Sequence, residues 1–339
     1  MLKTSVEVKT PSVQRLLNLW AQRYLTELSS VSQNDSAKYS SMLAAASPEG
    51  RAATVAKLKD NILDVNCQMA WIQTKTLYGY IPNILDLNEA RRITQFSLRV
   101  YRKLLEIYQQ QSVLGIPAVE ELAYGLEPIL MIFQEQHIVS KDWRALGFMT
   151  TQLNFSNSLI LRKLAPAEKV LLAPYLQFVE EQVAMPWQRV CAAAAKYELD
   201  SPVFILVEQM LSAVGEIAQA AYQRLVELFP HHRSRRGGLN DLSITHSCLR
   251  DLVMFQAYIL LCFLEESLTP IEVELLPLCV MVVEGVDIKW EMTEKWCQVL
   301  AWEIEIRLNP EQSSLLLPYV HQMQQLFFAH RERLGFQDC

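Results

Sequence analysis

The chain has 339 residues, of which 51% are hydrophobic and 20% are charged, with only 10 glycines and a formal net charge of −6. This length allows a substantial core, and this composition excludes a disordered or low-complexity protein. The acidic balance gives no support to nucleic acid as a partner, because phosphate binding requires clustered cations.

The first part of the chain predicts two long helices separated by a loop. Apolar residues recur at helical spacing from Pro11 to Ser30, and residues 31–41 are rich in Ser, Asn and Asp, which is typical of a loop. Ser47-Pro48-Glu49 predicts a helix start, because proline at the first helical position loses no hydrogen bond. We expect this helix to continue to about Tyr78. Its expected buried face consists of Leu58, Ile62, Val65, Met69 and Ile72.

Four further helices are expected before residue 185. They begin near Asp86, at Val119, after Ser140 and at Pro166, and the last ends near Ala184. The expected core face of the helix near Asp86 consists of Ile93, Phe96, Val100, Leu104 and Ile107. The same helix has an expected exposed basic stripe of Arg91, Arg92, Arg99, Arg102 and Lys103.

The second part of the chain begins at Met185-Pro186-Trp187 and is also predicted to be helical. After the Trp187 segment, the expected helices are Ser201–Phe229, Asn240–Ser267, Thr269–Gly285, Ile288–Leu308 and Pro310–Gly335. The connections are short, which favours antiparallel neighbours. The expected fold is therefore all-α, with about twelve helices.

Nothing in the sequence predicts a membrane or secreted protein. The longest apolar run, Leu252 to Leu264, has about 13 residues, whereas a bilayer span needs about 20. The first ten residues contain no apolar signal segment. Seven cysteines form no C-x-x-C pair and are odd in number, which indicates reduced thiols. We therefore expect a soluble cytoplasmic protein without a transmembrane segment.

One motif occurs twice at an offset of 144 residues. Leu164-x-Pro166-x-Glu168 through Pro174-Tyr175 matches Leu308-x-Pro310-x-Gln312 through Pro318-Tyr319. Weaker matches run through the rest of the chain, including Pro128 with Pro277, Trp143 with Trp290, and Gln14-Arg15 with Gln188-Arg189. The pattern predicts an internal duplication, with residues 1–184 and 185–339 as two similar six-helix halves.

The repeated prolines suggest bent helices. Pro174 and Pro318 fall two turns inside their helices, where proline removes a main-chain hydrogen bond and kinks the helix. A shape requirement is one explanation. The other is a ligand pocket beside the kinks, near Pro174, Tyr175, Pro318 and Tyr319, lined by the carbonyls that the prolines release at Val170 and Ser314.

A basic loop at residues 230–238 is the most conspicuous charge cluster of this acidic chain. Arginine pairs bidentately with carboxylate or phosphate, so the loop is a candidate docking site for an acidic partner or a phosphorylated ligand. The residues assigned to it are His231, His232, Arg233, Arg235 and Arg236. A solvated loop between helices is the alternative.

No catalytic or cofactor motif is present. Glu135-Gln-His137 lacks the i,i+3 spacing of a di-metal bundle, and no G-x-S-x-G, Cys-His or phosphate-binding glycine motif occurs. We expect no catalytic residue, no metal and no cofactor. Trp296 and Trp302 are six residues apart and cannot share a helical face, so one is a candidate exposed anchor.

These observations favour a non-enzymatic, α-helical protein-interaction module, such as an adaptor, scaffold, assembly factor or regulator. Its expected partner is a protein, and an acidic one would fit the basic loop. A helical carrier of an apolar ligand or pigment is the first alternative. An enzyme with a site assembled from distant residues is the second.

Overall fold

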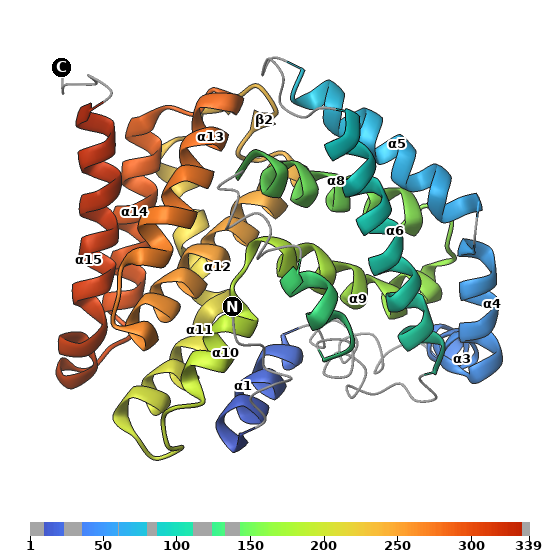
Figure 1. Ribbon diagram of the computed structural model, residues 1–339, viewed down its shortest axis with the longest axis horizontal. Coiled ribbons are helices and arrows are strands. Elements are labelled where there is room, and N and C mark those ends of the chain that lie inside the picture. The colour runs from blue at the N-terminus through green and yellow to red at the C-terminus, as the bar shows by residue number, and fades with distance from the viewer. Residues whose placement is uncertain are drawn as a thin grey trace. The chain divides into compact units, whose positions relative to one another are not determined.

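The computed structural model describes residues 10–23, 36–59, 61–79, 87–110, 124–132 and 143–333, and these residues are almost entirely helical (Figure 1). This confirms the predicted all-α class. Before residue 185 the helices are α1 (Pro11–Gln22), α3 (Ser36–Ala46), α4 (Pro48–Leu58), α5 (Asn61–Leu77), α6 (Leu87–Gln110), a segment at 124–132, α8 (Trp143–Leu161) and α9 (Pro166–Ala184). After it they are α10 (Trp187–Ala194), α11 (Pro202–Leu228), α12 (Leu242–Glu265), the π-helix η1 (Ile271–Leu275), α13 (Leu276–Val286), α14 (Trp290–Glu305) and α15 (Pro310–Arg333).

The chain divides into two compact units. Within the described residues, the first unit extends from Leu17 to Ala184, and the second comprises Thr10–Leu16 and everything from Met185 onward. Helix α1 therefore contributes residues to both units. That the units are copies of one repeat stays a prediction.

In the first unit, α5 packs against α6 and α8, and α8 packs against α9. Helix α3 lies on α9, and α4 lies on α6. The predicted core face of α6 is confirmed. Its members, Ile93, Phe96, Val100, Leu104 and Ile107, are all buried.

The predicted buried face of the helix that precedes α6 is wrong except at Leu58. The expected single helix from Pro48 to Tyr78 is divided at Lys59, whose extended backbone separates α4 from α5. Leu58 is buried at the end of α4, but the periodicity that begins there does not continue across the break. On α5 the buried residues include Leu63 and Cys67. The apolar stripe Ile62, Val65, Met69 and Ile72 is 38%, 53%, 45% and 50% exposed.

The predicted loop at residues 31–41 is also wrong in its second part. Helix α3 begins at Ser36, and Met42 and Ala46 are buried on it. Alanine, methionine and leucine from residue 42 onward favour a helix, so the polar residues before them form its first turns rather than a loop. The part of the predicted first helix that follows Arg23 lies outside the described residues, as does Ser140.

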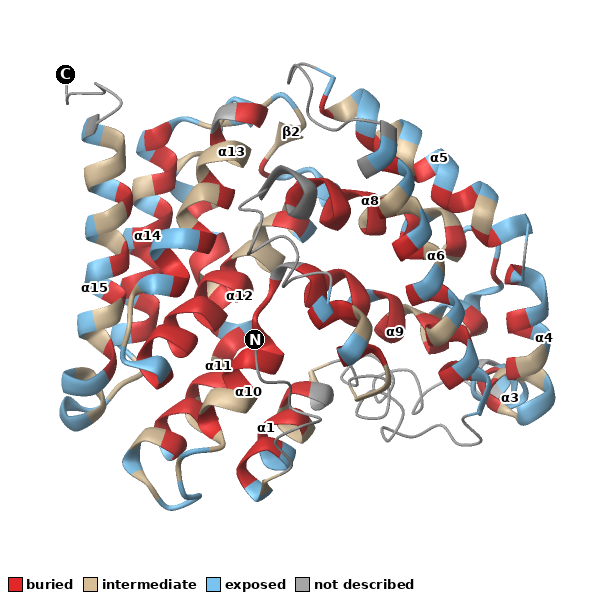
Figure 2. Cartoon of the chain, viewed as in Figure 1, coloured by how far each residue is buried: buried red, intermediate tan, exposed pale blue. Residues whose placement is uncertain are grey.

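In the second unit, α11 packs against α12 and α14, and α14 packs against α15. Helix α12 also contacts α10, α15 and η1 and is the central helix of this unit. Its residues from Leu252 to Leu264 are all buried (Figure 2). This explains why the longest apolar run of the sequence lies here.

Two described helices are long and apolar enough to cross a membrane by length and composition. In α12, 78% of the relevant segment is buried inside the structure, and in α11 the share is 44%. A core helix of a soluble protein passes the same test, so the two helices decide nothing about membrane association.

The predicted helix from Thr269 to Gly285 contains a π-helical turn. Pro277 has no N–H, so the carbonyl of Val273 cannot receive the usual helical bond. The chain widens just before the proline, and the N–H of Leu276 donates to the carbonyl of Ile271. This turn places Glu274 in the interior, where it is 5% exposed.

Several predicted helix starts are confirmed by side-chain caps. Ser47 Oγ accepts from the N–H of Gly50 at 3.0 Å, and Ser201 Oγ accepts from the N–H of Phe204 at 3.2 Å. The predicted capping box before α15 is also present. The N–H of Asn309 donates to Gln312 Oε1, and the N–H of Gln312 donates to Asn309 Oδ1, at 3.1 and 2.9 Å.

Candidate functional site

The predicted basic loop is a short β-ribbon rather than an open loop. Strand β1 (Arg233–Ser234) pairs antiparallel with β2 (Gly237–Gly238), with Arg233 opposite Gly238. Ser234 Oγ donates to the carbonyl of Gly237 and accepts from the N–H of Arg236, both at 3.2 Å. The turn therefore has a fixed shape.

The glycine pair makes this turn possible. Gly237 has a φ of 138°, which favours glycine, and a Cβ there would lie 2.2 Å from Asp241 Oδ2. The same oxygen accepts from the N–H of Gly238 at 2.8 Å. Asp241 directly precedes α12, so it ties the ribbon to the start of the central helix.

The ribbon displays positive charge at the surface. His231, Arg233 and Arg235 are exposed, and Arg236 is half-buried. The main-chain N–H of Arg235 donates to the carbonyl of Val286 at 2.9 Å, which fixes the ribbon to the end of α13. The positively charged side chains of the ribbon therefore project from a backbone that hydrogen bonds hold in place.

His232 differs from its neighbours. It is only partly exposed, and burial lowers its pKa, an effect that the positive charge of Lys289 reinforces and that Asp287 opposes. His232 is therefore mainly neutral at pH 7. The positive charge of the ribbon at neutral pH comes from its arginines, and Lys289 adds to it.

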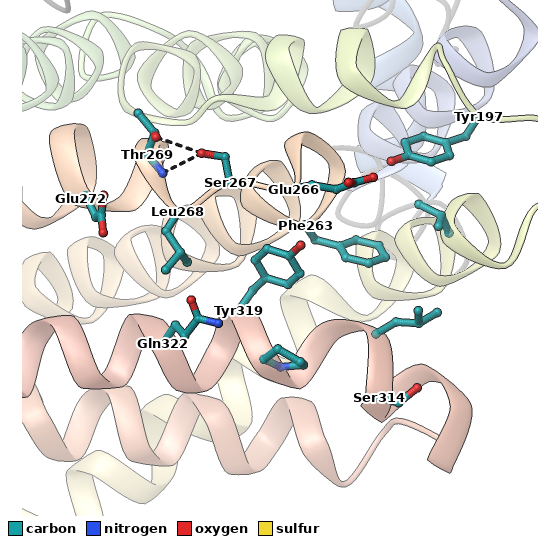
Figure 3. A pocket seen from close by; sticks show the side chains of 13 residues that line it. Tyr197, Phe263, Glu266, Ser267, Leu268, Thr269, Glu272, Ser314, Tyr319 and Gln322 are labelled. Carbon is teal, nitrogen blue, oxygen red and sulfur yellow. Dashed lines mark hydrogen bonds between the residues drawn. The ribbon is translucent and has the colours of Figure 1, made fainter.

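The second candidate site is a cavity of about 750 Å³ in the second unit (Figure 3). It lies among three segments: residues around Tyr197 and Val203, the end of α12 with the turn that follows it, and α15. Pro318 and Tyr319, two of the four residues predicted beside a ligand pocket, lie on its wall.

Aromatic rings and a carboxylate meet on one wall. Phe263 and Tyr319 pack edge to face with ring centroids 5.9 Å apart. The hydroxyl of Tyr197 donates to the carbonyl of Leu264 at 3.2 Å and points toward Glu266 in Figure 3. Burial raises the pKa of Tyr319, and the nearby charge of Glu266 raises it further. Tyr319 is therefore a neutral phenol close to a carboxylate.

The matching residues of the first unit have different surroundings. Pro174 is buried, and Tyr175 is 4% exposed and packs edge to face on Tyr108 at 5.2 Å. Neither residue lines the cavity of the second unit. Helices α9 and α15 both continue through their inner prolines.

Several cysteines are unsuited to nucleophilic chemistry. Burial raises the pKa of Cys67, Cys248 and Cys262 to about 12 each. Their thiols are thus protonated at neutral pH, whereas the thiolate is the nucleophile. Within the described residues, no group of three His, Cys, Asp or Glu side chains is placed to hold a metal ion.

A buried ion pair was not predicted. Arg189 Nη1 lies 2.8 and 2.6 Å from the two carboxylate oxygens of Glu274, and the hydroxyl of Tyr258 donates to Glu274 Oε2 at 3.3 Å. Burial alone would lower the pKa of Arg189, but the charge of Glu274 outweighs it and raises that pKa. The pair connects α10 to the π-helical turn and is structural.

The prediction that one of two tryptophans is exposed is confirmed. Trp302 is 42% exposed and Trp296 is 9% exposed. The guanidinium of Arg224 lies 3.8 Å from the ring centre of Trp302.

Comparison with models of known protein families, with curated proteins and with solved structures gives no match.

Proposed function

We propose that the chain is a non-enzymatic, α-helical interaction protein of the cytoplasm, acting as an adaptor or assembly factor, and that its basic ribbon docks an acidic segment of a protein partner. The observation that carries the proposal is the fixed presentation of the arginines. A flexible loop would lose side-chain and backbone entropy on binding, and a hydrogen-bonded ribbon loses less of it.

Charge complementarity supports an acidic partner. The chain has a formal net charge of −6, so a concentrated cationic patch stands out against an acidic background. Exposed guanidinium groups pair bidentately with carboxylates, which gives direction as well as attraction. The ribbon offers Arg233 and Arg235 at the surface, with Arg236 beside them.

The proposal includes the duplication of one helical module, with residues 1–184 and 185–339 as its two copies. Similar packing within each unit supports it. In the first unit α5 contacts α6 and α8, and α8 contacts α9; in the second α11 contacts α12 and α14, and α14 contacts α15. The repeated tryptophans, Trp143 and Trp290, are each the first residue of the corresponding helix.

The closing helices share their starts. Pro166 opens α9 and Pro310 opens α15. The N–H of Ala165 donates to Glu168 Oε2 at 2.8 Å, as the N–H of Asn309 donates to Gln312. The match of Gln14-Arg15 with Gln188-Arg189 has no such support. Arg15 pairs with Glu208 and is largely exposed, whereas Arg189 is buried and pairs with Glu274.

The experiment compares two sets of three charge reversals. Arg233, Arg235 and Arg236 are changed to glutamate in the test variant. Arg91, Arg99 and Arg102, three exposed arginines on α6, are changed in the control. Proteins retained by the intact chain from its native source are identified, and an acidic peptide from the main partner is then titrated against all three forms.

The test variant should lose that partner and bind the peptide at least tenfold more weakly, while the control binds it as the intact chain does. Binding should weaken with added salt, because the contacts are charged and exposed. Circular dichroism checks that helicity is unchanged. Equal binding by the two variants would refute the docking role of the ribbon.

Carriage of a small molecule is a second candidate function. The specific observation in its favour is the cavity beside Pro318 and Tyr319, whose volume of about 750 Å³ is in the usual range for a ligand site. Native mass spectrometry of protein purified from its source tests this candidate, because a carrier should retain additional mass that is lost on denaturation.

A further inference from the structure

We propose that the cavity of the second unit binds a linear organic polycation of the aliphatic polyamine class. The inference deepens the second candidate function and rests on it, and it does not depend on the ribbon. Its basis is the combination of carboxylates, aromatic rings and apolar side chains on the cavity wall.

The charged side chains that line the cavity are acidic. Glu266 and Glu272 both line the cavity, and none of the described residues that line it is lysine or arginine. A ligand with a single charge would leave one carboxylate without a counter-charge. Two ammonium groups separated by a methylene chain would match both carboxylates.

The aromatic residues suit the same ligand. Tyr197, Phe263 and Tyr319 line the cavity on the side of Glu266, and aromatic faces attract cations within about 6 Å of the ring centre. Lys196 already uses this interaction, since its Nζ lies 5.1 Å from the ring centre of Tyr197. This lysine is outside the lining and would compete with a bound ammonium group for that ring.

Hydrogen-bond acceptors complete the site. Pro318 has no N–H to donate to the carbonyl of Ser314, and Ser314 lines the cavity. Ser267 and Thr269 line it as well and bond to each other through their hydroxyls at 2.9 Å. Primary and secondary ammonium groups have N–H donors for such acceptors, whereas a quaternary ammonium ion has none.

Apolar side chains separate the polar groups. Val203, Leu268 and Leu315 belong to the lining and offer contact to a methylene chain. Glu266 and Glu272 are both exposed, and a neutral apolar ligand would offer them no counter-charge. This mixture therefore fits a polyamine better than the apolar pigment that the sequence suggested.

Glu266 is held in an unusual backbone conformation. Its φ of 52° is the left-handed region that ends many helices, and glycine is the usual residue there. Glutamate at this position projects a carboxylate beside the aromatic rings (Figure 3). Glycine suits this backbone conformation but has no carboxylate. Glu266→Gly should therefore raise the free energy of unfolding and weaken polyamine binding.

The test is isothermal titration of the full chain with spermidine, with choline as the quaternary control. Spermidine should bind one to one, and choline should bind at least tenfold more weakly. Glu266→Gln and Glu272→Gln should each weaken spermidine binding about tenfold, since a charge-assisted hydrogen bond is lost. Lys196→Gln should strengthen it.

Glu216→Gln is the matched control, because Glu216 is an exposed residue of α11 that does not line the cavity and its replacement removes the same charge. It should bind spermidine as the intact chain does. Equal losses in all three glutamine variants, or no saturable binding, would overturn the polyamine proposal. Retention of a neutral molecule in native mass spectrometry would overturn it while leaving the carrier function standing.

Discussion

The buried Arg189–Glu274 pair gives the sharpest test of the second unit. The two side chains are 8% and 6% exposed, so neither charge has much contact with water. Replacing Glu274 by glutamine leaves the guanidinium buried without its counter-charge. Removing one partner of such a pair typically costs about 3–5 kcal/mol, a large part of the 5–15 kcal/mol of a typical domain.

The double replacement distinguishes a true pair from two independent effects. Arg189→Met with Glu274→Leu removes both charges and keeps apolar volume, and such replacements are often neutral or stabilising. We therefore expect the double variant to be more stable than either of its single variants, Arg189→Met or Glu274→Leu. Urea unfolding followed by circular dichroism measures the free energies of unfolding.

A surface pair serves as the comparison. Arg15 and Glu208 also form an ion pair in the second unit, but the Arg15 side chain is 56% exposed. Glu208→Gln should therefore cost less than about 1 kcal/mol. If Glu274→Gln costs as little as Glu208→Gln, or if the effects of Arg189→Met and Glu274→Leu simply add in the double variant, the assignment of a buried coupled pair is wrong.

Three further predictions concern the first unit and the ribbon. On α5, Val65→Ser should change the free energy of unfolding by less than about 1 kcal/mol because the Val65 side chain is exposed. Leu63→Ala should cost about 2–5 kcal/mol because Leu63 is buried. Comparable costs for the two variants would show that Val65 is a core residue. Burial raises the pKa of Glu168, but hydrogen bonds from Lys57 and from the N–H of Ala165 outweigh burial, so the net pKa is lowered. The ionised Glu168 side chain therefore stabilises the fold fully at neutral pH, and this stabilisation should decline as the pH falls below 4.5. Glu168→Gln should reduce this decline in urea unfolding at pH 7 and pH 3.5, and an unchanged decline would contradict it. Gly237→Ala should distort the ribbon and shift the amide resonances around Asp241, because its Cβ would overlap the carboxylate; unshifted resonances would show that the turn tolerates a side chain.

Local signals were sufficient for much of the fold. Pro48, Pro166, Pro202 and Pro310 each open a helix, because proline is favoured at the first helical position. In three of these helices the polar residue before the proline caps the helix directly. Such signals depend on a few neighbouring residues, so the sequence contains them completely. The all-α class followed from the same signals and from the scarcity of glycine.

The buried face of α5 could not be chosen from periodicity. This helix has apolar residues on more than one side, among them Leu63 on the buried side and Val65 and Ile72 on the exposed side. Which side is buried depends on the position of α8, a helix about 80 residues further along the chain. Tertiary packing thus decided between two faces that the local pattern left equivalent.

The two candidate sites differ in how far the sequence could reveal them. All the cations of the ribbon lie within six consecutive residues, so their charge was visible, but the turn was not, because it depends on Asp241 bonding to Gly238. The cavity is lined by residues from three separate segments, so no local pattern contains it. Only its part near Ser314, Pro318 and Tyr319 was anticipated, through the repeated motif.

The two copies of that motif show how one sequence pattern can have two outcomes. Tyr175 is 4% exposed and packs on Tyr108, whereas Tyr319 is only half-buried and lies on a cavity wall beside Glu266. Tyr175 packs edge to face on Tyr108 of α6, and Tyr319 packs edge to face on Phe263 of α12. Helices α6 and α12 occupy matching positions in the proposed repeat, so the local packing is alike. The difference is what lies beyond the ring. If the units descend from one module, as proposed, the first copy has the tyrosine in its core, and the second has it on the wall of the cavity for which we propose a ligand.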